Sequence, residues 1–334
     1  MRKTELMLGP LDELLHHPQV TDAAVTCDGR VWADYGGGMQ EFFPVIGFES
    51  PDMVREFAVC LCAQLGKRLD DARPIADAST DDGIRVNAVI APIVPCGASV
   101  SIRFPDRRFS RLPALGASGL FPSSWMPMLH ALVEEQATIL ITGGTGTGKT
   151  TLLRALLAEC GAQERIVSVE EVRELGDFGH ANHVSLASRE ANVEGSGAIS
   201  LAELVRATLR MRPDRVVLGE CRGEEIADLL RALNSGHHGG MATMHADGVR
   251  RVPARLQTLG LLAGLRPEAL AMLAEGAFDV VVHLERQHGV RRIAQIGTLV
   301  TDETTGRLQG HALCEWDGRT SPVVHSDWRL YVSR

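Results

Sequence analysis

An apolar strand, a glycine-rich turn and a helix follow one another directly in residues 138–158, and this stretch constrains the fold more than any other. The turn from Gly143 to Thr150 fits the pattern G-x-x-x-x-G-K-[ST], which is typical of phosphate-binding loops. Its glycines let backbone N–H groups close around the β- and γ-phosphates without a Cβ in the way. The sequence therefore predicts a nucleotide site on a strand–loop–helix unit whose helix begins at Lys149.

The chemistry expected of this loop follows from its residue types. Lys149 is predicted to reach the terminal phosphates and the Thr150 hydroxyl to ligate Mg²⁺, while the helix N-terminus adds partial positive charge. The predicted cofactors are therefore ATP and Mg²⁺. The predicted nucleotide ligands are Gly143, Gly144, Thr145, Gly146, Thr147, Gly148, Lys149, Thr150 and Thr151.

Length and composition limit the remaining possibilities. The 334 residues suffice for two domains. No apolar stretch approaches the roughly 20 residues that span a bilayer, and residues 1–5 lead into no secretory segment, so we expect a cytoplasmic protein. The seven cysteines include no Cys-x-x-Cys pair, which predicts neither a zinc site nor a disulfide framework.

Charge argues against a general nucleic-acid surface, because the net charge is −8. A local basic patch stays possible where arginines crowd one segment, although a solvated hinge explains the same pattern. These arginines are Arg103, Arg107, Arg108 and Arg111.

The chain divides by composition into two predicted domains. Residues 1–104 are predicted to form an N-terminal α+β domain with a small sheet, and residues 105–120, which carry prolines and glycines, a linker. In the first domain we expect helices and strands at 11–15, 22–26, 30–33, 52–65, 85–90 and 99–103.

Residues 121–334 are predicted to alternate strands with helices, which indicates a largely parallel, helix-covered sheet. The expected strands are 138–142, 165–170, 216–219 and 241–245, and the expected helices 149–160, 200–211, 224–234 and 250–259. Ser200 and Glu203 form a capping-box pattern. The tail after about 278 predicts antiparallel strands with a turn at His288 and Gly289.

Acidic residues follow two of the expected strands, where open α/β sheets place their ligands. Glu220 follows the 216–219 strand, and we expect it to hold the metal's water shell or to polarise the attacking water. Glu170 ends the preceding strand and is the favoured general base or water-positioning group. Glu171 and Glu174 are supporting carboxylates, although acids at such a strand exit are also commonly solvated.

Histidines flank the 241–245 strand on both sides. His245 and His237 are predicted to sense the γ-phosphate, against the alternative of surface histidines; a metal site lacks supporting Cys or Asp spacing. Guanidinium groups suit stabilisation of phosphoryl charge from a neighbouring subunit or domain. The candidate arginines are Arg85, Arg103, Arg206, Arg210, Arg212 and Arg222.

Taken together, these stretches resemble the ATPases of type II and type IV secretion and pilus systems. The closest subgroup resembles the CpaF-like ATPases of tight-adherence pili, which include proteins labelled as conjugal-transfer-associated. The resemblance covers roughly residues 10–300. It is carried by 85–90, 101–103, the phosphate loop, 166–174, 209–223 and 234–246, which match the family's arginine positions, Walker A, Asp box, Walker B and His box.

The resemblance implies an α/β fold, in which a RecA-like P-loop NTPase domain follows a smaller N-terminal α+β domain. It also implies a hexameric ring in which the N-terminal domain closes over bound ATP, bringing Arg85 and Arg103 to the phosphates. Arg210 and Arg222 match positions near the subunit boundary. The chain differs from the family pattern at Glu171, where the family usually has Asp, and it lacks the four-cysteine zinc insertion of some type II motors.

The function expected from these features is Mg²⁺-dependent ATP hydrolysis by a cytoplasmic motor. Such a motor acts on an inner-membrane platform to assemble a pilus or secrete a protein. Two alternatives stay open: a DNA-translocating ATPase of the conjugation type, for which nucleic-acid partners have little support in charge or aromatic content, and a nucleotide-binding scaffold without hydrolysis.

Overall fold

The computed structural model describes residues 6–80, 83–105, 111–189, 191, 196–287 and 289–325, which fall into two compact units. Unit 1 contains the described residues of Met1–Arg108 together with Val172–Gly176, and unit 2 contains those of Phe109–Glu171 and Asp177–Arg334. The segment predicted as a linker includes helix α3 (Leu112–Ala117), in which Leu112 and Leu115 are buried. Arg107, Arg108 and His288, named in the sequence predictions, lie outside the described residues.

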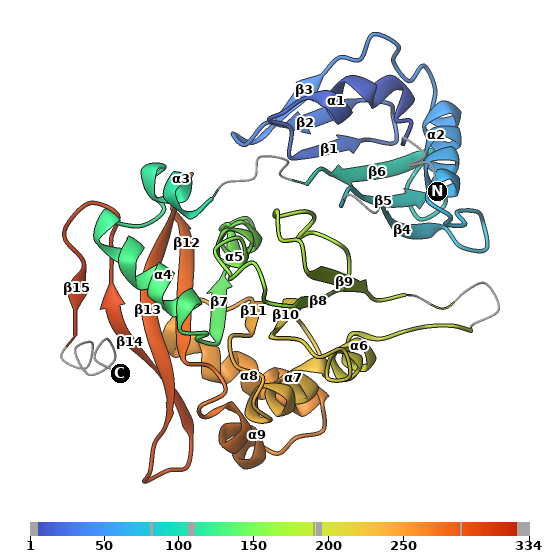
Figure 1. Cartoon of the computed structure of the whole chain (residues 1–334). Coiled ribbons are helices and arrows are strands. Elements are labelled where there is room, and N and C mark those ends of the chain that lie inside the picture. Colours follow the sequence, from blue (N-terminus) through green and yellow to red (C-terminus); the bar gives the residue numbers. More distant parts are fainter. Residues whose placement is uncertain are drawn as a thin grey trace. The chain divides into compact units, whose positions relative to one another are not determined.

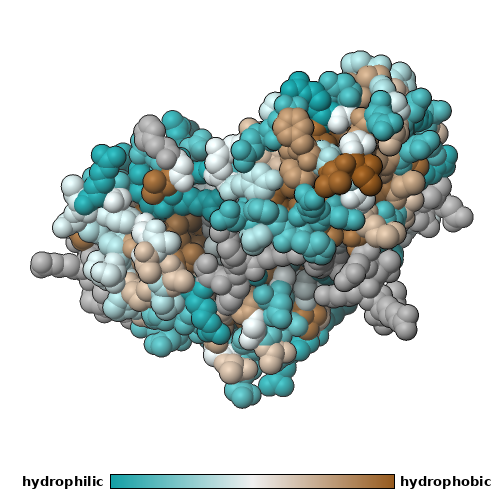
Figure 2. Space-filling model, turned by 90° about the horizontal axis from the view of Figure 1, so that it is seen from above, coloured by the Kyte–Doolittle hydropathy of each residue, from teal (hydrophilic) through white to brown (hydrophobic). Residues whose placement is uncertain are grey.

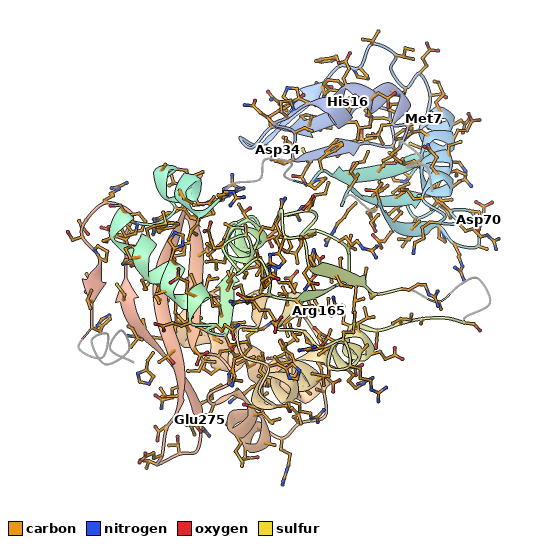
Figure 3. The ribbon with its side chains drawn as sticks, viewed as in Figure 1. Met7, His16, Asp34, Asp70, Arg165 and Glu275 are labelled. Atoms are coloured by element: carbon orange, nitrogen blue, oxygen red, sulfur yellow. The ribbon has the colours of Figure 1, made fainter. Side chains whose placement is uncertain are left out.

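Unit 1 is built on an antiparallel sheet that has six strands among the described residues, in the order β3-β2-β1-β6-β5-β4. Helix α2 packs on β5 and β6, and Ser50 caps it by accepting a hydrogen bond from Met53 N. Met7, labelled in Figure 3, is tied to the end of α2 because its N–H donates to Gln64 Oε1 at 3.0 Å. The bounds are η1 (Gly9–Leu11), α1 (Asp12–His16), β1 (Asp22–Val25), β2 (Val31–Asp34), β3 (Met39–Phe42), α2 (Pro51–Gln64), β4 (Ile75–Ser79), β5 (Arg85–Ile90) and β6 (Ala98–Arg103).

Unit 2 is built on a second sheet, with nine strands in the described part of the chain, in the order β15-β14-β13-β12-β7-β11-β10-β8-β9. The strands from β12 to β9 are parallel, and those from β12 to β15 alternate in direction. The predicted α/β class is therefore confirmed. The bounds are β7 (Ile139–Gly143), β8 (Ile166–Glu170), β9 (His183–Ala187), β10 (Arg215–Cys221), β11 (Met241–Met244), β12 (Val280–Gln287), β13 (Val290–Thr301), β14 (Leu308–Glu315) and β15 (Val323–Val324).

Helices cover both faces of this sheet, with α3, α4 and α5 in contact in one group and α6 to α9 in the other (Figure 1). Every residue of β7, β8 and β11 is buried, as expected of parallel strands covered on two sides. The predicted capping box at Ser200 is present at the start of α6. The bounds are η2 (Ser123–Trp125), α4 (Met126–Glu134), α5 (Lys149–Leu157), α6 (Leu201–Thr208), α7 (Glu225–Asn234), η3 (Val249–Arg251), α8 (Val252–Leu262) and α9 (Pro267–Ala274).

Two sequence predictions about these strands need correction. Strand β10 does not end before Glu220 but continues to Cys221, with an irregular pairing to β11 between Leu218 and Cys221. The tail is not wholly antiparallel, because β12 also pairs in parallel with β7. The sequence pattern could not predict this pairing, because an apolar run indicates a buried strand but not whether its neighbour runs parallel or antiparallel to it.

The surface of the protein mixes residue types, and hydrophobic residues lie among hydrophilic ones on the face that Figure 2 shows. The exposed hydrophobic residues include Phe43, Val45 and Met272. Exposed apolar side chains of this kind are ordinary, because apolar atoms supply more than half of a protein's accessible surface.

Arg215, the first residue of β10, has a fully buried side chain held by an ion pair and two carbonyls. Its Nε and Nη2 donate to the Glu164 carboxylate, and Nη2 also donates to Val133 O at 2.7 Å. Nη1 donates to Gly239 O at 3.3 Å. Removing one partner of a buried ion pair leaves an uncompensated charge, so this residue is a sensitive point of unit 2.

We expect Arg215→Met to lower the free energy of unfolding by about 3–5 kcal/mol, since Glu164 and two carbonyls lose their donor. The matched control is Arg206→Met, because the Arg206 side chain is more than half exposed and its partner Asp228 keeps a second ion pair, with Arg231; that exchange should cost at most about 1 kcal/mol. Equilibrium urea unfolding measures both. Equal losses in the two variants would contradict the assignment of Arg215 as a buried support.

Candidate nucleotide-binding site

The phosphate loop connects the carboxyl end of β7 to the start of α5. Gly148, which caps α5, has a φ of 98°, and Gly146 has a φ of 72°, so both adopt the left-handed conformation that glycine tolerates best. A Cβ on Gly143 would lie 2.5 Å from the carbonyl oxygen of Leu284. The glycines are therefore required by the turn and by the close approach of β12. The resulting backbone cradle fits a phosphate group.

Lys149 is buried at the base of this loop. Its Nζ donates to the carbonyls of Gly143 and Gly144, both at 3.0 Å, and lies 3.4 Å from His245 Nε2. Thr147 Oγ1 donates to Gly144 O at 2.9 Å, which further fixes the loop. The ammonium group is thus held within the loop, where a phosphate-loop lysine acts.

Glu170 and Glu220 lie on neighbouring parallel strands, β8 and β10. Glu170 is the last residue of β8 and its side chain is buried. A Cβ on Gly219 would lie 2.8 Å from Glu170 Cγ, so the absence of a side chain at Gly219 makes room for this carboxylate. Thr243 Oγ1, on β11, donates to Gly219 O at 2.6 Å and fixes the same backbone.

Polar contacts link the His box to the two acidic strands. His245 Nε2 lies 2.7 Å from Glu220 Oε1. Arg222 Nε donates to Glu220 Oε2 at 2.8 Å, and its Nη1 donates to Glu171 Oε2 at 3.0 Å. Burial, with the charge of Lys149, lowers the pKa of His245, which favours the neutral imidazole. The structure therefore brings Lys149, Glu220, His245 and Arg222 into one cluster.

Other predicted site residues lie elsewhere. His237 precedes β11, whereas His245 follows it, and four residues of strand separate the two ends by roughly 13 Å. His237 Nδ1 instead lies 3.2 Å from Ala232 O, at the end of α7. Arg210 follows α6 and is exposed, before β10 begins rather than at its carboxyl end. The structure brings neither residue to the phosphate loop.

The two arginines predicted in the first domain face each other within unit 1. Arg85 on β5 is the cross-strand partner of Arg103 on β6. Arg85 also forms an ion pair with Glu174, a carboxylate predicted to support Glu170. Within unit 1, the Glu174 carboxylate therefore neutralises the charge of Arg85.

His283, a buried histidine of β12, was not among the residues predicted for the site. Its Nδ1 lies 3.0 Å from Thr142 Oγ1, directly before the phosphate loop. A single histidine within the apolar run Val280–Leu284 was the available signal. Burial lowers the pKa of His283 and of His183, which lies on β9.

These two histidines should make the protein less stable in mild acid. Their folded pKa values lie below the unfolded value of about 6.5, so on acidification the unfolded chain takes up protons before the folded chain does. Stability is then fully present above about pH 6.5 and is lost as the pH falls through the folded pKa values. Urea unfolding at pH 7.5 and 5.5 measures this, and His283→Gln should reduce the difference. Equal stability at both pH values would contradict the expectation.

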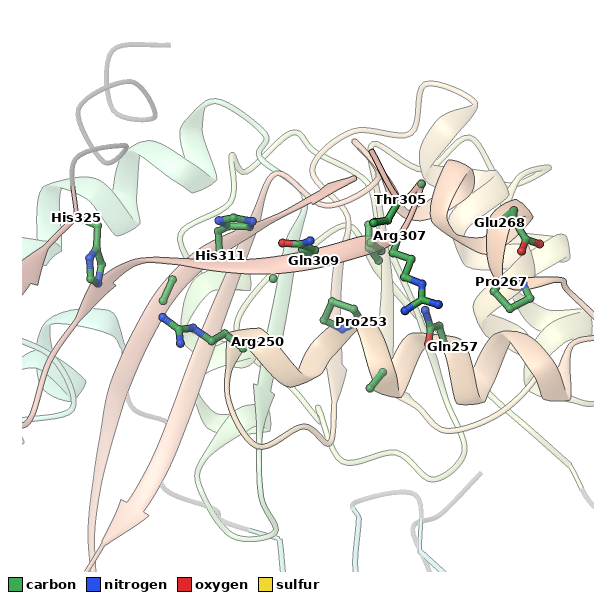
Figure 4. Close-up of a pocket in the computed structure, with 15 residues that line it drawn as sticks. Arg250, Pro253, Gln257, Pro267, Glu268, Thr305, Arg307, Gln309, His311 and His325 are labelled. Atoms are coloured by element: carbon green, nitrogen blue, oxygen red, sulfur yellow. The ribbon is translucent and has the colours of Figure 1, made fainter. Parts of the chain in front are cut away.

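A separate groove lies between α8 and β14 (Figure 4) and has a volume of about 1140 Å³. Its polar lining includes Arg250, Gln257, Arg307, Gln309 and His311. No residue predicted for nucleotide binding or catalysis lines it. The groove is therefore distinct from the cluster around Lys149.

Within the described ranges, no group of three or more His, Cys, Asp or Glu side chains is arranged to hold a metal ion. A Mg²⁺ ion at the predicted ligands Thr150 and Glu220 would share its coordination with nucleotide phosphates, so it needs no such group. In the same part of the chain, no helix is long and apolar enough to cross a membrane.

Known proteins are similar to this chain over almost its whole length. The family model described as "Type II/IV secretion system protein" matches residues 5–315. A putative conjugal transfer protein of Mycobacterium tuberculosis is 41% identical, over 92% of this chain and 88% of that protein. The type IV secretion system protein PtlH of Bordetella pertussis is 33% identical, over 86% and 93% of the two chains.

Solved structures show the same fold. The ATPase DotB of Legionella pneumophila aligns with a TM-score of 0.60 at 20% identity, covering 92% of this chain and 84% of that one. The pilus retraction motor PilT with bound ADP aligns with a TM-score of 0.57 at 19% identity, covering 90% and 81%. The expected RecA-like fold with an N-terminal domain is confirmed at this level.

Proposed function

We propose, from the premise that this chain belongs to the type II/IV secretion system protein family, that it is a Mg²⁺-dependent ATPase that powers pilus assembly or protein secretion. One observation carries the proposal. Lys149, held in the phosphate loop, lies 3.4 Å from His245, and His245 lies 2.7 Å from Glu220 on the Walker B strand. Three of the groups proposed to act in phosphoryl transfer thus lie together in one chain.

In this function each residue has a distinct role. The loop's N–H groups bind the phosphates, and Lys149 offsets charge on the terminal phosphate. Glu170, buried at the end of β8, orients the attacking water or accepts its proton. Thr150 and Glu220 hold Mg²⁺, which supplies charge stabilisation at the phosphoryl oxygens. His245 joins Lys149 to Glu220 and reports on the γ-phosphate.

The active form is proposed to be a ring of identical subunits, a hexamer by family resemblance. Domain closure would bring Arg85 and Arg103 to the phosphates, and Arg210 and Arg222 would lie near the subunit boundary. Support comes from Arg103, which lies opposite Arg85 on the neighbouring strand and is exposed, so its guanidinium group is accessible to an anionic ligand. The ring would act at the inner face of the cell membrane on platform proteins of a pilus or secretion system.

A DNA-translocating ATPase is the second candidate, because a relative at 41% identity is described as a putative conjugal transfer protein. The net charge of −8 and the aromatic content of 4% offer little for a DNA groove. Single-stranded DNA should therefore leave the hydrolysis rate unchanged. Salt-sensitive stimulation by DNA would favour this candidate instead.

The proposal is tested by Mg-ATP hydrolysis per subunit over a wide range of protein concentration. We expect the specific rate to climb steeply and then level off, because subunits complete each other's sites in a ring. A flat, measurable rate would contradict the ring and the arginine roles between subunits. Tight ATP binding without hydrolysis, even with membrane partners supplied, would indicate a nucleotide-binding scaffold.

A further inference from the structure

The hairpin of β12 and β13 lies beside the phosphate loop, and its arginines have no part in the function proposed above. Strand β12 pairs in parallel with β7, with Leu284 opposite Gly143. Gly143 is the last residue of β7, whereas β12 continues through Gln287. On the side of β12 that faces β7, the residues after Leu284 therefore have the phosphate loop as their neighbour and not a strand.

Two arginines of this hairpin lie against the loop itself. A Cβ built on Gly146 would lie 3.6 Å from Arg286 Nη1, and one built on Gly148 would lie 3.6 Å from Arg291 Cδ. These are ordinary contact distances, so both side chains lie next to the loop's backbone. Both residues are also exposed, which leaves them accessible to a ligand from solvent.

The two arginines are directly opposed in the antiparallel pairing of β12 with β13. Opposed positions in an antiparallel pair lie on the same face of a sheet, so the two arginines are carried on one face of the hairpin. Guanidinium groups match phosphate oxygens in charge and geometry. The arrangement therefore suits an anion at the loop.

Arg292, the next residue, differs from these two. It lies opposite Glu285, and its Nη2 donates to Glu285 Oε2 at 3.0 Å and to Gln287 Oε1 at 3.2 Å. Alternation along a strand turns it to the other face from Arg291. Arg292 therefore belongs to the same hairpin but lies on its other face, which makes it a matched comparison.

We propose that Arg286 and Arg291 bind the polyphosphate chain of a nucleotide held in the loop of the same subunit. This inference rests on the proposed nucleotide site. It adds two positively charged side chains to the one that Lys149 provides. Because ADP and ATP share the β-phosphate that the loop surrounds, the two arginines should strengthen the binding of both nucleotides. Both arginines belong to the same chain as the loop, so this binding needs no neighbouring subunit.

The experiment is isothermal titration of the full chain with Mg-ADP and with a non-hydrolysable ATP analogue. We expect Arg286→Gln and Arg291→Gln each to weaken both affinities about tenfold, the loss typical of a charged hydrogen bond. Arg291→Lys should recover part of the loss, because it keeps the charge. Arg292→Gln removes the same charge from the same hairpin and should stay within about threefold of the wild-type affinity.

Three results would overturn the inference. These are wild-type affinity in both glutamine variants, equal weakening by Arg292→Gln, or a lower melting temperature of the nucleotide-free chain with unchanged affinity. The last result would assign the arginines a structural role only. Failure of the proposed function looks different, since ADP would then fail to bind the wild-type chain, or would bind Lys149→Ala equally well.

Discussion

Replacement of Lys149 with alanine is expected to lower ATP hydrolysis about 10²–10³-fold or more. Nζ is the buried cation of the loop, held by the carbonyls of Gly143 and Gly144. Its removal leaves the terminal phosphate without the charge that stabilises the transition state. Steady-state phosphate release at saturating Mg-ATP measures the loss.

The chain offers a matched control for this variant. Lys67 follows helix α2 in unit 1, so Lys67→Ala removes the same charge far along the chain from the loop and should hydrolyse ATP at the wild-type rate. Circular dichroism should show that Lys149→Ala remains folded. Unchanged hydrolysis in a folded Lys149→Ala protein would refute the assignment of the site.

Replacement of Glu170 with glutamine is expected to lower the hydrolysis rate about 10²–10³-fold while ATP affinity changes only a few-fold. The carboxylate is buried at the end of β8, beside Gly219 of β10. Glutamine has nearly the same shape, so it fits the same space but accepts no proton from water. Separate measurements of nucleotide binding and of single-turnover hydrolysis distinguish the two effects.

Glu171→Gln is the matched control, because the next carboxylate is exposed and pairs with Arg222 at 3.0 Å. Its hydrolysis rate should stay within about fivefold of wild type. If Glu170→Gln retains hydrolysis, Glu170 is not the general base; a loss in Glu220→Gln alone would fit either a base or the proposed Mg²⁺ ligand. Retained hydrolysis in both would exclude either carboxylate as the base.

Much of the parallel core of unit 2 could be predicted from sequence, because its signals are local. Buried strands such as β7 and β8 appear as short apolar runs, and the phosphate loop appears as glycines followed by Lys149 and Thr150. The start of α6 was equally clear from its capping box. In each case the residues that determine the structure lie within a few positions of one another.

The lateral order of the strands could not be predicted in the same way. Strand β12 inserts beside β7 although about 140 residues separate them in the chain, and this pairing brings His283 to Thr142 and two arginines to the loop. Apolar runs record burial but not the neighbour that provides it. Long-range partners were therefore missed although their own segment was recognised as strand.

The sequence by itself determined that this chain carries a phosphate loop, acids at strand ends and a histidine-rich segment. Only the tertiary structure decided which of these residues meet. His237 and His245 flank the same short strand, yet the strand separates them to opposite ends and leaves His245 alone beside Lys149. The physical reason is that residue types follow from local chemistry, whereas distances between side chains follow from strand direction, register and order, which are set by packing across the whole sheet.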